Sequence, residues 1–193
     1  HYLFCEQYDK KAGKAGIGYF VFENGIPRNK GIIISQPYHM SYPCVFSYND
    51  DIYMIPETSA NKTIELYRAV DFPHQWKLEE VLLRGEQYVD STVFKADGKT
   101  YLLSYIKHEG AWHLDTFELD IEKAQLDKVS RMTYWENVGR PAGSVIYVDG
   151  DLLRPAQDCS KKYGDAMLMY KMVGFRDGIF DEQLQDRVTT DMF

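Results

Sequence analysis

The chain has 193 residues, of which 45% are hydrophobic and 26% charged, and its formal net charge at pH 7 is −7. This is the composition of a globular protein, which excludes a disordered or collagen-like chain. No apolar run approaches the roughly 20 residues that a membrane-spanning helix needs. Lysines and arginines are scattered without a basic stripe, so nucleic acid is not an expected partner.

The three cysteines, Cys5, Cys44 and Cys159, are too few and too widely spaced for a disulfide framework or a zinc site. Free thiols favour a reducing compartment such as the cytoplasm. The chain opens at His1 in mid-pattern, so we expect the natural protein to extend upstream. We therefore infer nothing about the compartment from a missing signal peptide.

Short runs rich in Tyr, Val, Ile and Phe recur along the chain and predict strands separated by turns. In chain order they are 2–4, 17–22, 31–34, 44–46, 52–55, 64–67, 92–94, 101–106, 112–119, 145–148 and 166–172. Helical character is weak at 77–83 and 121–128, and the tail 180–188 is predicted to form one short helix.

Three of these strand pairs form hairpins that repeat. Their turns are Asn49-Asp50-Asp51, Asp97-Gly98-Lys99 and Asp149-Gly150-Asp151, residue types that tolerate positive φ or cap locally. Equivalent residues of the hairpins are separated by 94 − 46 = 48 and 146 − 94 = 52 positions. Tyr2 matches the second strand of the same hairpin, since 53 − 2 = 51.

A period near fifty with about four strands per period is typical of β-propeller blades. We therefore predict an all-β chain in which 1–193 is a single β-propeller domain of about four blades, with the first blade incomplete. An antiparallel sandwich is the alternative. Because an incomplete ring exposes strand edges, we expect upstream chain or a second copy of the chain to cover them, the latter giving a homo-oligomer.

The polar residues before each first strand would lie at one mouth of a propeller channel. Aligned on the hairpins, Tyr42, Asp90 and Ala142 are equivalent, and His39, Asp90 and Arg140 are expected to cluster there.

The second strands end in another polar slot. Glu6 and Glu57 each follow the matched tyrosine by four residues, Tyr105 occupies the third slot, and Ala156 is taken for the fourth. Arg154 and Asp158 flank that last position and are candidate binding residues.

A ring of Glu, Asp, His and Arg suits two chemistries. Paired carboxylates of different pKa can hydrolyse a glycosidic bond, or charged groups beside aromatic rings can hold a polyol or sugar phosphate. A third interpretation is a satisfied ion-pair network that only fills the channel. The sequence requires no cofactor and shows no ligand spacing for a metal, leaving a channel cation as an alternative.

Several strings resemble one family: 39–43 (His-Met-Ser-Tyr-Pro), 53–59, 64–68, 89–94, 140–143 and 154–159 with Tyr163-Gly164. Together they resemble the N-terminal domain of plant glucosamine inositolphosphorylceramide transferases and its microbial relatives. That domain is similar to the five-bladed propellers of arabinanases, levansucrases and invertases.

The resemblance implies a five-bladed propeller that binds or acts on a carbohydrate, and it leaves catalysis open because a separate glycosyltransferase domain follows in the plant proteins. In the related glycosidases three acids act. Asp90 stands where the acid that orients substrate is expected, Glu57 is the best candidate proton donor, and Glu6 is the candidate substitute for a base on the absent upstream strand. His39, Tyr42, Arg140, Arg154 and Asp158 are the implied substrate-binding residues.

Overall fold

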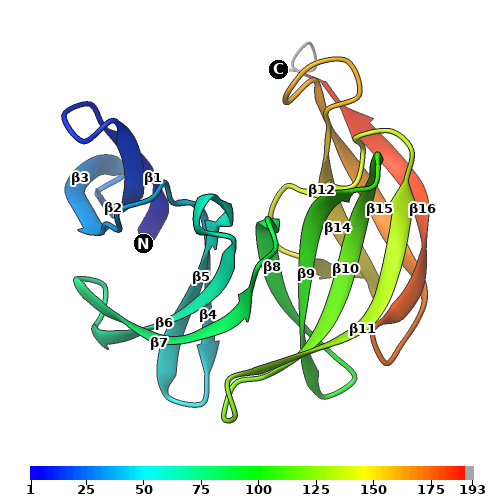
Figure 1. Cartoon of the computed structure of the whole chain (residues 1–193), viewed down its shortest axis with the longest axis horizontal. Helices are drawn as coiled ribbons and strands as arrows, with labels where there is room; N and C mark the ends of the chain where they lie inside the picture. The colour runs from blue at the N-terminus through cyan, green and yellow to red at the C-terminus, as the bar shows by residue number, and fades with distance from the viewer. Residues whose placement is uncertain (190–193) are drawn as a thin grey trace. The chain divides into compact units, whose positions relative to one another are not determined.

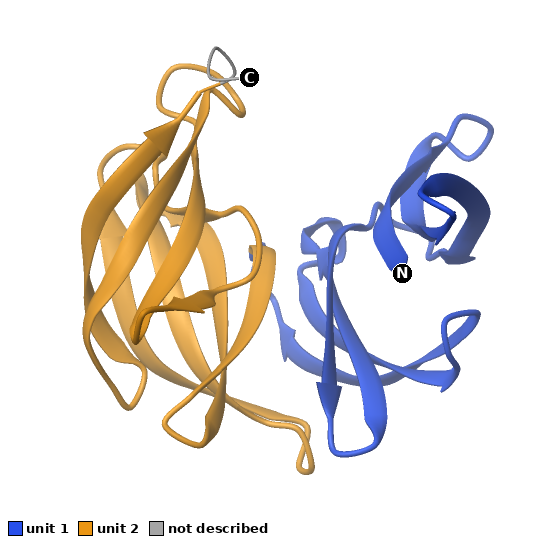
Figure 2. Ribbon diagram, turned by 180° about the vertical axis from the view of Figure 1, so that it is seen from behind, with its two compact units in different colours: residues 1–88 blue, residues 89–193 orange. Residues whose placement is uncertain are grey.

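The computed structural model describes residues 1–189. That part consists of sixteen strands and one 3-10 turn, η1 (Ser59–Asn61), and contains no α-helix. No helix within it is long and apolar enough to cross a membrane. The chain divides into two compact units, unit 1 (His1–Tyr88) and unit 2 (Val89–Phe193), coloured separately in Figure 2.

Unit 1 contains two antiparallel sheets. The first has the order β1-β2-β3, formed by β1 (Tyr2–Asp9), β2 (Lys14–Glu23) and β3 (Ile26–Ile34). The second has the order β4-β5-β6-β7, formed by β4 (Ser41–Tyr48), β5 (Asp51–Thr58), β6 (Thr63–Asp71) and β7 (Gln75–Arg84).

Unit 2 also contains two antiparallel sheets. The sheet β8-β9-β10-β11 is formed by β8 (Val89–Ala96), β9 (Lys99–His108), β10 (Ala111–Asp120) and β11 (Gln125–Tyr134), which lie side by side in Figure 1. The last sheet is formed by β12 (Arg140–Pro141), β13 (Ile146–Val148), β14 (Asp151–Asp158), β15 (Ala166–Arg176) and β16 (Ile179–Val188), with β12 and β13 both paired to β14.

The repeated hairpins form as predicted. Asn49, Asp97 and Asp149 each begin a two-residue turn with φ of 51°, 49° and 51°. These residue types accept positive φ at low cost, which gives the tight turn that antiparallel strands need. Within residues 1–189 the first sheet has no strand matching β4, β8 and β12, so the predicted incompleteness of the first blade is confirmed for that range.

Each unit has its own core. In unit 1 it is built from Ile17, Ile34, Met40, Met54 and Tyr67. In unit 2 the buried core comprises Phe94, Ala96, Tyr101, Leu103, Tyr105, Leu114, Leu152, Met172 and Phe180. The strands that carry these cores are buried over continuous stretches, such as residues 15–19 of β2 and 101–106 of β9, which is why they read as apolar runs in the sequence.

The three helical predictions are wrong. Residues 77–83 lie inside β7, residues 121–128 form the turn into β11 and the start of that strand, and residues 180–188 belong to β16. Pairing with a neighbouring strand outweighs local helix propensity in all three places.

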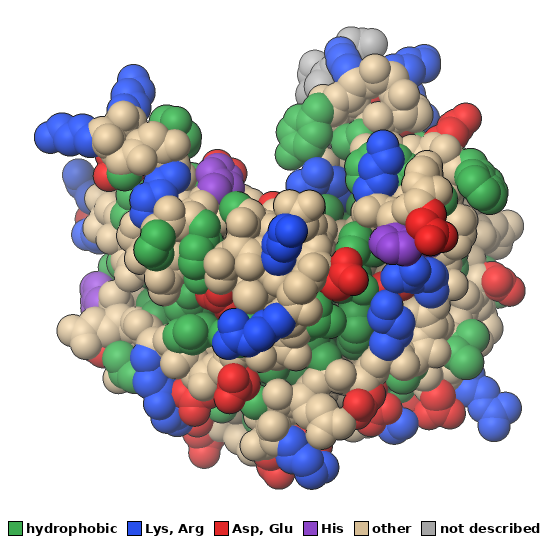
Figure 3. All heavy atoms as spheres, in the orientation of Figure 1, with side chains coloured by type: hydrophobic (Ala, Val, Ile, Leu, Met, Phe, Trp, Pro, Cys, Tyr) green, Lys and Arg blue, Asp and Glu red, His purple; other side chains and the backbone are tan. Residues whose placement is uncertain are grey.

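Charged side chains of both signs are interspersed over the face drawn in Figure 3, and no large area of it carries one sign. This distribution agrees with the absence of a basic stripe in the sequence.

Candidate functional site

Asp90 lies in a bulge at the start of β8. Val89 pairs with Tyr105 and Thr92 with Leu103, so two residues of β8 face one of β9. Asp90 has φ of 49°. A bulge of this kind re-aims a side chain that regular alternation would point elsewhere. Tyr42 has the matching bulge in β4 and φ of 42°, so the predicted equivalence of Tyr42 and Asp90 is confirmed. The third predicted member, Ala142, is wrong by one residue: Arg140 pairs with Gln157 as Val89 pairs with Tyr105, so Pro141 takes the position of Asp90.

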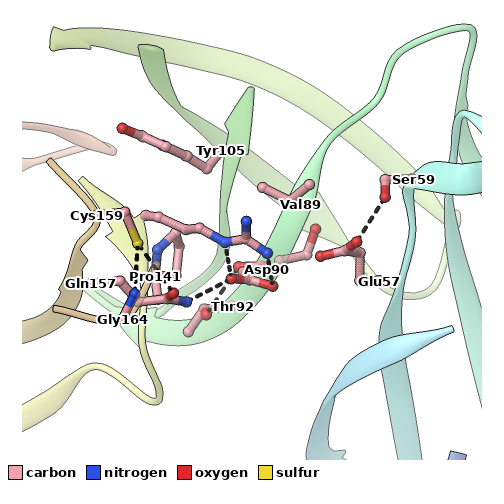
Figure 4. Close-up of polar contacts among 12 residues, drawn as sticks. Glu57, Ser59, Val89, Asp90, Thr92, Tyr105, Pro141, Gln157, Cys159 and Gly164 are labelled. Carbon is pink, nitrogen blue, oxygen red and sulfur yellow. Dashed lines mark hydrogen bonds and ion pairs between the residues drawn. The ribbon is translucent and has the colours of Figure 1, made fainter. Parts of the chain in front are cut away.

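The Asp90 carboxylate is 2% exposed and is held by two side chains from the last sheet of unit 2. Arg140 Nε lies 2.5 Å from Oδ2, and Arg140 Nη2 lies 3.2 Å from Oδ1. Gln157 Nε2 donates to Oδ2 at 2.9 Å and to the Pro141 carbonyl oxygen at 3.0 Å. Figure 4 shows Gln157 pointing toward Asp90, with Cys159 beside it. We call Asp90, Arg140 and Gln157 the Asp90 cluster.

The sequence predicted Asp90 and Arg140 but missed Gln157. The fourth slot was taken to be Ala156, yet Arg140 pairs with Gln157 as Val89 pairs with Tyr105 and Ser41 with Glu57. Counting from the turns finds it, because Glu57, Tyr105 and Gln157 each follow Asp51, Lys99 and Asp151 by six residues.

Arg154 lies inside the last sheet with 0% exposure. Its guanidinium donates to Glu182 Oε1 at 2.6 Å, to the Gly139 carbonyl oxygen at 3.0 Å and to the Tyr134 hydroxyl at 3.2 Å. Burial is the largest single effect and disfavours the charged form, but attraction to Glu182 together with Tyr134 and Tyr170 outweighs it, and the pKa of Arg154 is raised. Through its bond to the Gly139 carbonyl oxygen, Arg154 therefore fixes the backbone directly before Arg140.

Asp158 fixes the loop that follows β14. Its Oδ1 accepts from the backbone N–H and the hydroxyl of Ser160, at 3.0 and 2.6 Å. Arg187 Nε donates to its Oδ2 at 3.1 Å. The Ser160 hydroxyl is the main reason that the pKa of Asp158 is lowered, against an opposing effect of burial and with help from Arg187.

Glu6 and His39 of unit 1 form a second polar group. The His39 Nδ1 accepts from the Ala15 backbone N–H at 3.4 Å, and its Nε2 lies 3.3 Å from Glu6 Oε1. The acceptor role of Nδ1 assigns the proton to Nε2, which donates to Glu6. Both side chains are more than 40% exposed, so this pair contributes little to folding stability.

Glu57 is the penultimate residue of β5 and occupies the predicted slot opposite Ser41. It is half-buried, and its Oε1 accepts from the Ser59 hydroxyl at 2.7 Å. The dashed line in Figure 4 marks this bond.

Glu65 is a buried carboxylate of unit 1 that the sequence did not single out; it is 1% exposed. It accepts from four neutral donors: the hydroxyls of Tyr38, Tyr67 and Thr63, and the Asn61 amide. Burial, together with the hydrogen bond to Glu65, raises the pKa of both tyrosines. This arrangement joins the segment before β4 to β6.

A separate cavity of about 290 Å³ in unit 2 lies beside the turn between β13 and β14. Its lining includes Asp97, Tyr147, Asp151, Lys171 and Phe175, and Lys171 Nζ lies 2.6 Å from Asp151 Oδ2. Within residues 1–189 no group of three or more His, Cys, Asp or Glu side chains is placed to hold a metal ion.

Solved structures of similar shape are sugar-cleaving enzymes by their titles. The chain matches an α-L-arabinofuranosidase from Clostridium thermocellum with a TM-score of 0.70 at 13% identity, covering 95% of this chain and 68% of that one. It matches an exo-β-1,3-galactanase from the same organism with a TM-score of 0.71 at 15% identity, covering 98% and 46%. An endo-arabinanase from Bacillus licheniformis gives 0.60 at 16% identity, covering 96% and 75%. At these identities the likeness shows the fold, a β-propeller of which this chain supplies about four blades.

Sequence relatives are closer. The chain is 34% identical over 151 residues to glucosamine inositolphosphorylceramide transferase 1 of Arabidopsis thaliana, and 31% identical over 164 residues to that of Oryza sativa subsp. japonica. Each match covers 74% of this chain and 20% of the relative, so the chain spans about one fifth of these proteins. The family model of the N-terminal region of glucosamine inositolphosphorylceramide transferase 1 matches residues 1–186. The chain therefore belongs to the family of the N-terminal domain of glucosamine inositolphosphorylceramide transferase 1.

Proposed function

We propose that this domain binds a saccharide or sugar phosphate at the Asp90 cluster, as the sugar-recognising part of a glycosyltransferase-type protein. The observation that carries the proposal is a buried carboxylate fixed by a partly exposed arginine and an amide. The side chains of Asp90 and Arg140 are 3% and 21% exposed. Convergent polar groups of fixed geometry are how sugar hydroxyls and phosphates are recognised.

The bonding of Asp90 favours holding a ligand over transferring a proton. Both of its oxygens accept from Arg140, and Oδ2 also accepts from Gln157. These bonds keep the Arg140 guanidinium in one orientation, and a guanidinium of fixed orientation suits the binding of a phosphate or of two neighbouring hydroxyls. Cleavage by Glu57, Asp90 and Glu6 stays a sequence prediction.

The names of the relatives supply the first ligands to try. The matched proteins are glucosamine inositolphosphorylceramide transferases, so glucosamine and inositol phosphate are natural probes. Arabinose and galactose follow from the titles of the structural neighbours.

Thermal unfolding in the presence of these four probes tests the proposal. A ligand at about 100 times its dissociation constant stabilises the folded state by about 2.7 kcal/mol, which raises Tm by about 5 to 11 °C at this size. We expect one probe to raise Tm for the unchanged protein and not for Asp90→Asn or Arg140→Met. None of these probes contains a glycosidic bond, so hydrolysis is tested separately with an arabino- or galacto-oligosaccharide, from which cleavage would release free sugar.

Asp115→Asn is the matched control. Asp115 is another buried carboxylate of unit 2, with Arg131 Nε and Nη2 at 2.6 and 2.7 Å. It lies on β10 outside the Asp90 cluster, so its replacement should lower Tm without removing the ligand-induced rise. The proposal is wrong if no probe raises Tm, or if the rise persists in both Asp90→Asn and Arg140→Met.

A further inference from the structure

Two aromatic side chains stand out by their exposure. Trp135 is 85% exposed and Tyr163 is 76% exposed, the two highest values among the large hydrophobic residues of the described chain. The other two tryptophans, Trp76 and Trp112, are half-buried and pack against Phe4 and Tyr105. A single exposed aromatic residue needs no explanation, whereas two on joined loops make a candidate ligand-contacting surface.

The loops that carry these rings are joined to one another. Trp135 precedes the segment 136–139, and Tyr163 lies in the loop 159–165. The Cys159 backbone N–H donates to the Asn137 carbonyl oxygen at 2.8 Å, which fastens one loop to the other. The Gly139 N–H also approaches the Tyr105 hydroxyl at 3.4 Å.

The loop 159–165 is held at both ends. The Asp165 N–H donates to the Asp158 carbonyl oxygen at 3.0 Å, and the Gly164 N–H donates to Cys159 Sγ at 3.4 Å. The Cys159 thiol in turn approaches Gln157 Oε1 at 3.7 Å, and Figure 4 shows these three residues together. Loop 159–165 is therefore tied to the amide that contacts Asp90.

Tyr163 also contacts the Asp90 cluster directly. The Arg140 guanidinium carbon lies 5.6 Å from the centre of the Tyr163 ring, within the range of a cation–π contact. Arg140 covers one face of the ring, and the high exposure of Tyr163 leaves the other face open to solvent.

We propose that Tyr163, which contacts Arg140, is the stacking residue of the Asp90 cluster, and that Trp135, exposed beside the segment bonded to the loop of Tyr163, adds the second ring. They hold a saccharide by the C–H face of its ring while Asp90, Arg140 and Gln157 bind its polar groups. The proposal rests on the proposed function and adds the residues that make the site select a ring. Aromatic faces supply apolar contact of this kind at sites where polar groups fix orientation. Stacking also requires a ring-shaped ligand, so inorganic phosphate would gain nothing from these two residues.

The experiment uses the saccharide that gives the largest Tm rise in the screen, with inorganic phosphate as the second probe. Binding is measured by calorimetry for Tyr163→Ala, Trp135→Ala and the control Tyr147→Ala. Tyr147 is an exposed tyrosine of unit 2 on β13, at 60% exposure. We expect saccharide affinity to fall about tenfold in each of the first two variants, by analogy with alanine substitution at stacked rings, and to be unchanged in Tyr147→Ala. Phosphate affinity should be the same in all of them.

Tryptophan fluorescence gives a readout that a loss of folding would not imitate. Saccharide binding should shield Trp135 from a neutral quencher in the unchanged protein and not in Asp90→Asn. In Trp135→Phe the protection should vanish, because Trp76 and Trp112 pack against Phe4 and Tyr105 and are not part of the proposed stacking surface.

The outcomes separate the two proposals. If Asp90→Asn abolishes saccharide binding while Tyr163→Ala and Trp135→Ala keep full affinity, the stacking proposal is overturned and the proposed function stands. If Tyr147→Ala weakens binding as much as they do, the stacking proposal is also overturned. If no saccharide binds the unchanged protein, both fall.

Discussion

Arg154 shows how one buried charge organises the region around the candidate site. Its partners are the Glu182 carboxylate, the Tyr134 hydroxyl and the Gly139 carbonyl oxygen, and its guanidinium carbon lies 5.4 Å from the centre of the Tyr170 ring. Removing a charge from water is costly, and the cost is offset only when the buried group is well paired; here each of the three guanidinium nitrogens donates a hydrogen bond. The sequence predicted that Arg154 binds substrate. In the structure Arg154 is buried and instead bonds to the segment that precedes Arg140.

Replacing Arg154 with Met should therefore lower the free energy of unfolding by about 3 to 5 kcal/mol, because Glu182 is left buried without a cation. The double variant Arg154→Met with Glu182→Met should lose less, since no charge is stranded. Urea unfolding of the two variants measures both values. A single variant as stable as the double one would contradict this account.

Among single residues, the sequence predicted the polar centre of the candidate site but not the aromatic residues proposed to surround it. Asp90 and Arg140 could be predicted because they occupy repeat positions that the hairpins align. Gln157 could have been found by counting from the turn at Asp149-Gly150. Trp135 and Tyr163 could not, because their exposure depends on loops outside the repeat.

The segment 180–188 explains the failure of helix prediction at the scale of the element. Phe180, Leu184 and Val188 are four residues apart, a spacing that places them on one face of a helix and also on one face of a strand. The charged residues between them suit the exposed edge of a sheet. Pairing of β16 with β15 decides the outcome.

The turn between β15 and β16 offers a test of packing within unit 2. Gly178 has φ of 80°, and an added Cβ would lie 2.5 Å from Val129 Cγ2. Gly174 has φ of 63° and no neighbour within 4 Å of such an atom. Both alanine variants lose about 1 to 2 kcal/mol from the left-handed conformation, but only Gly178→Ala should lose more through the clash. Comparable losses by chemical unfolding would show that this contact does not matter.

Loop 159–165 should loosen in acid. The pKa of Asp158 is lowered in the folded protein, so its contribution to stability is present above its unfolded value, about 3.9, and is lost as pH falls through the folded value. Hydrogen exchange at the Ser160 amide measures this loss. It should be slow at neutral pH and lose protection in acid, after correction for intrinsic rates.

Asp158→Asn provides the comparison for that experiment. An amide cannot titrate, so protection at Ser160 should be weaker in the variant and should not depend on pH in the same range. A variant that follows the pH profile of the unchanged protein would exclude Asp158 as the titrating group.

At the scale of the whole molecule, tyrosines set an alkaline limit. Burial raises the pKa of Tyr38 and Tyr67 in unit 1 and of Tyr105 and Tyr134 in unit 2. The unfolded chain releases these protons near pH 10, while the folded chain retains them. Stability should therefore fall above pH 10, by about 1.4 kcal/mol per pH unit for each such tyrosine.

Phenolate absorbance and circular dichroism, followed together as pH rises, measure this limit. Ionisation of the buried tyrosines should coincide with loss of the β-sheet signal. Complete ionisation of all fifteen tyrosines in a chain that keeps its sheet signal would contradict the effect of burial.

The repeat explains why the fold could be predicted so far from one sequence. The turn residues, the apolar runs and the period near fifty all indicate the same strand arrangement. A sequence specifies one fold when its local and long-range signals agree in this way. A closed ring of five blades stays a prediction, as does assembly through strand edges, since neither follows from the hairpins.

A crystal structure with the saccharide selected by the thermal screen tests the central claim most directly. We predict that its hydroxyl or phosphate groups lie within hydrogen-bond distance of Asp90, Arg140 or Gln157, and that its ring lies against the open face of Tyr163. A saccharide bound instead in the cavity lined by Tyr147 and Lys171, with the Asp90 cluster untouched, would contradict the account.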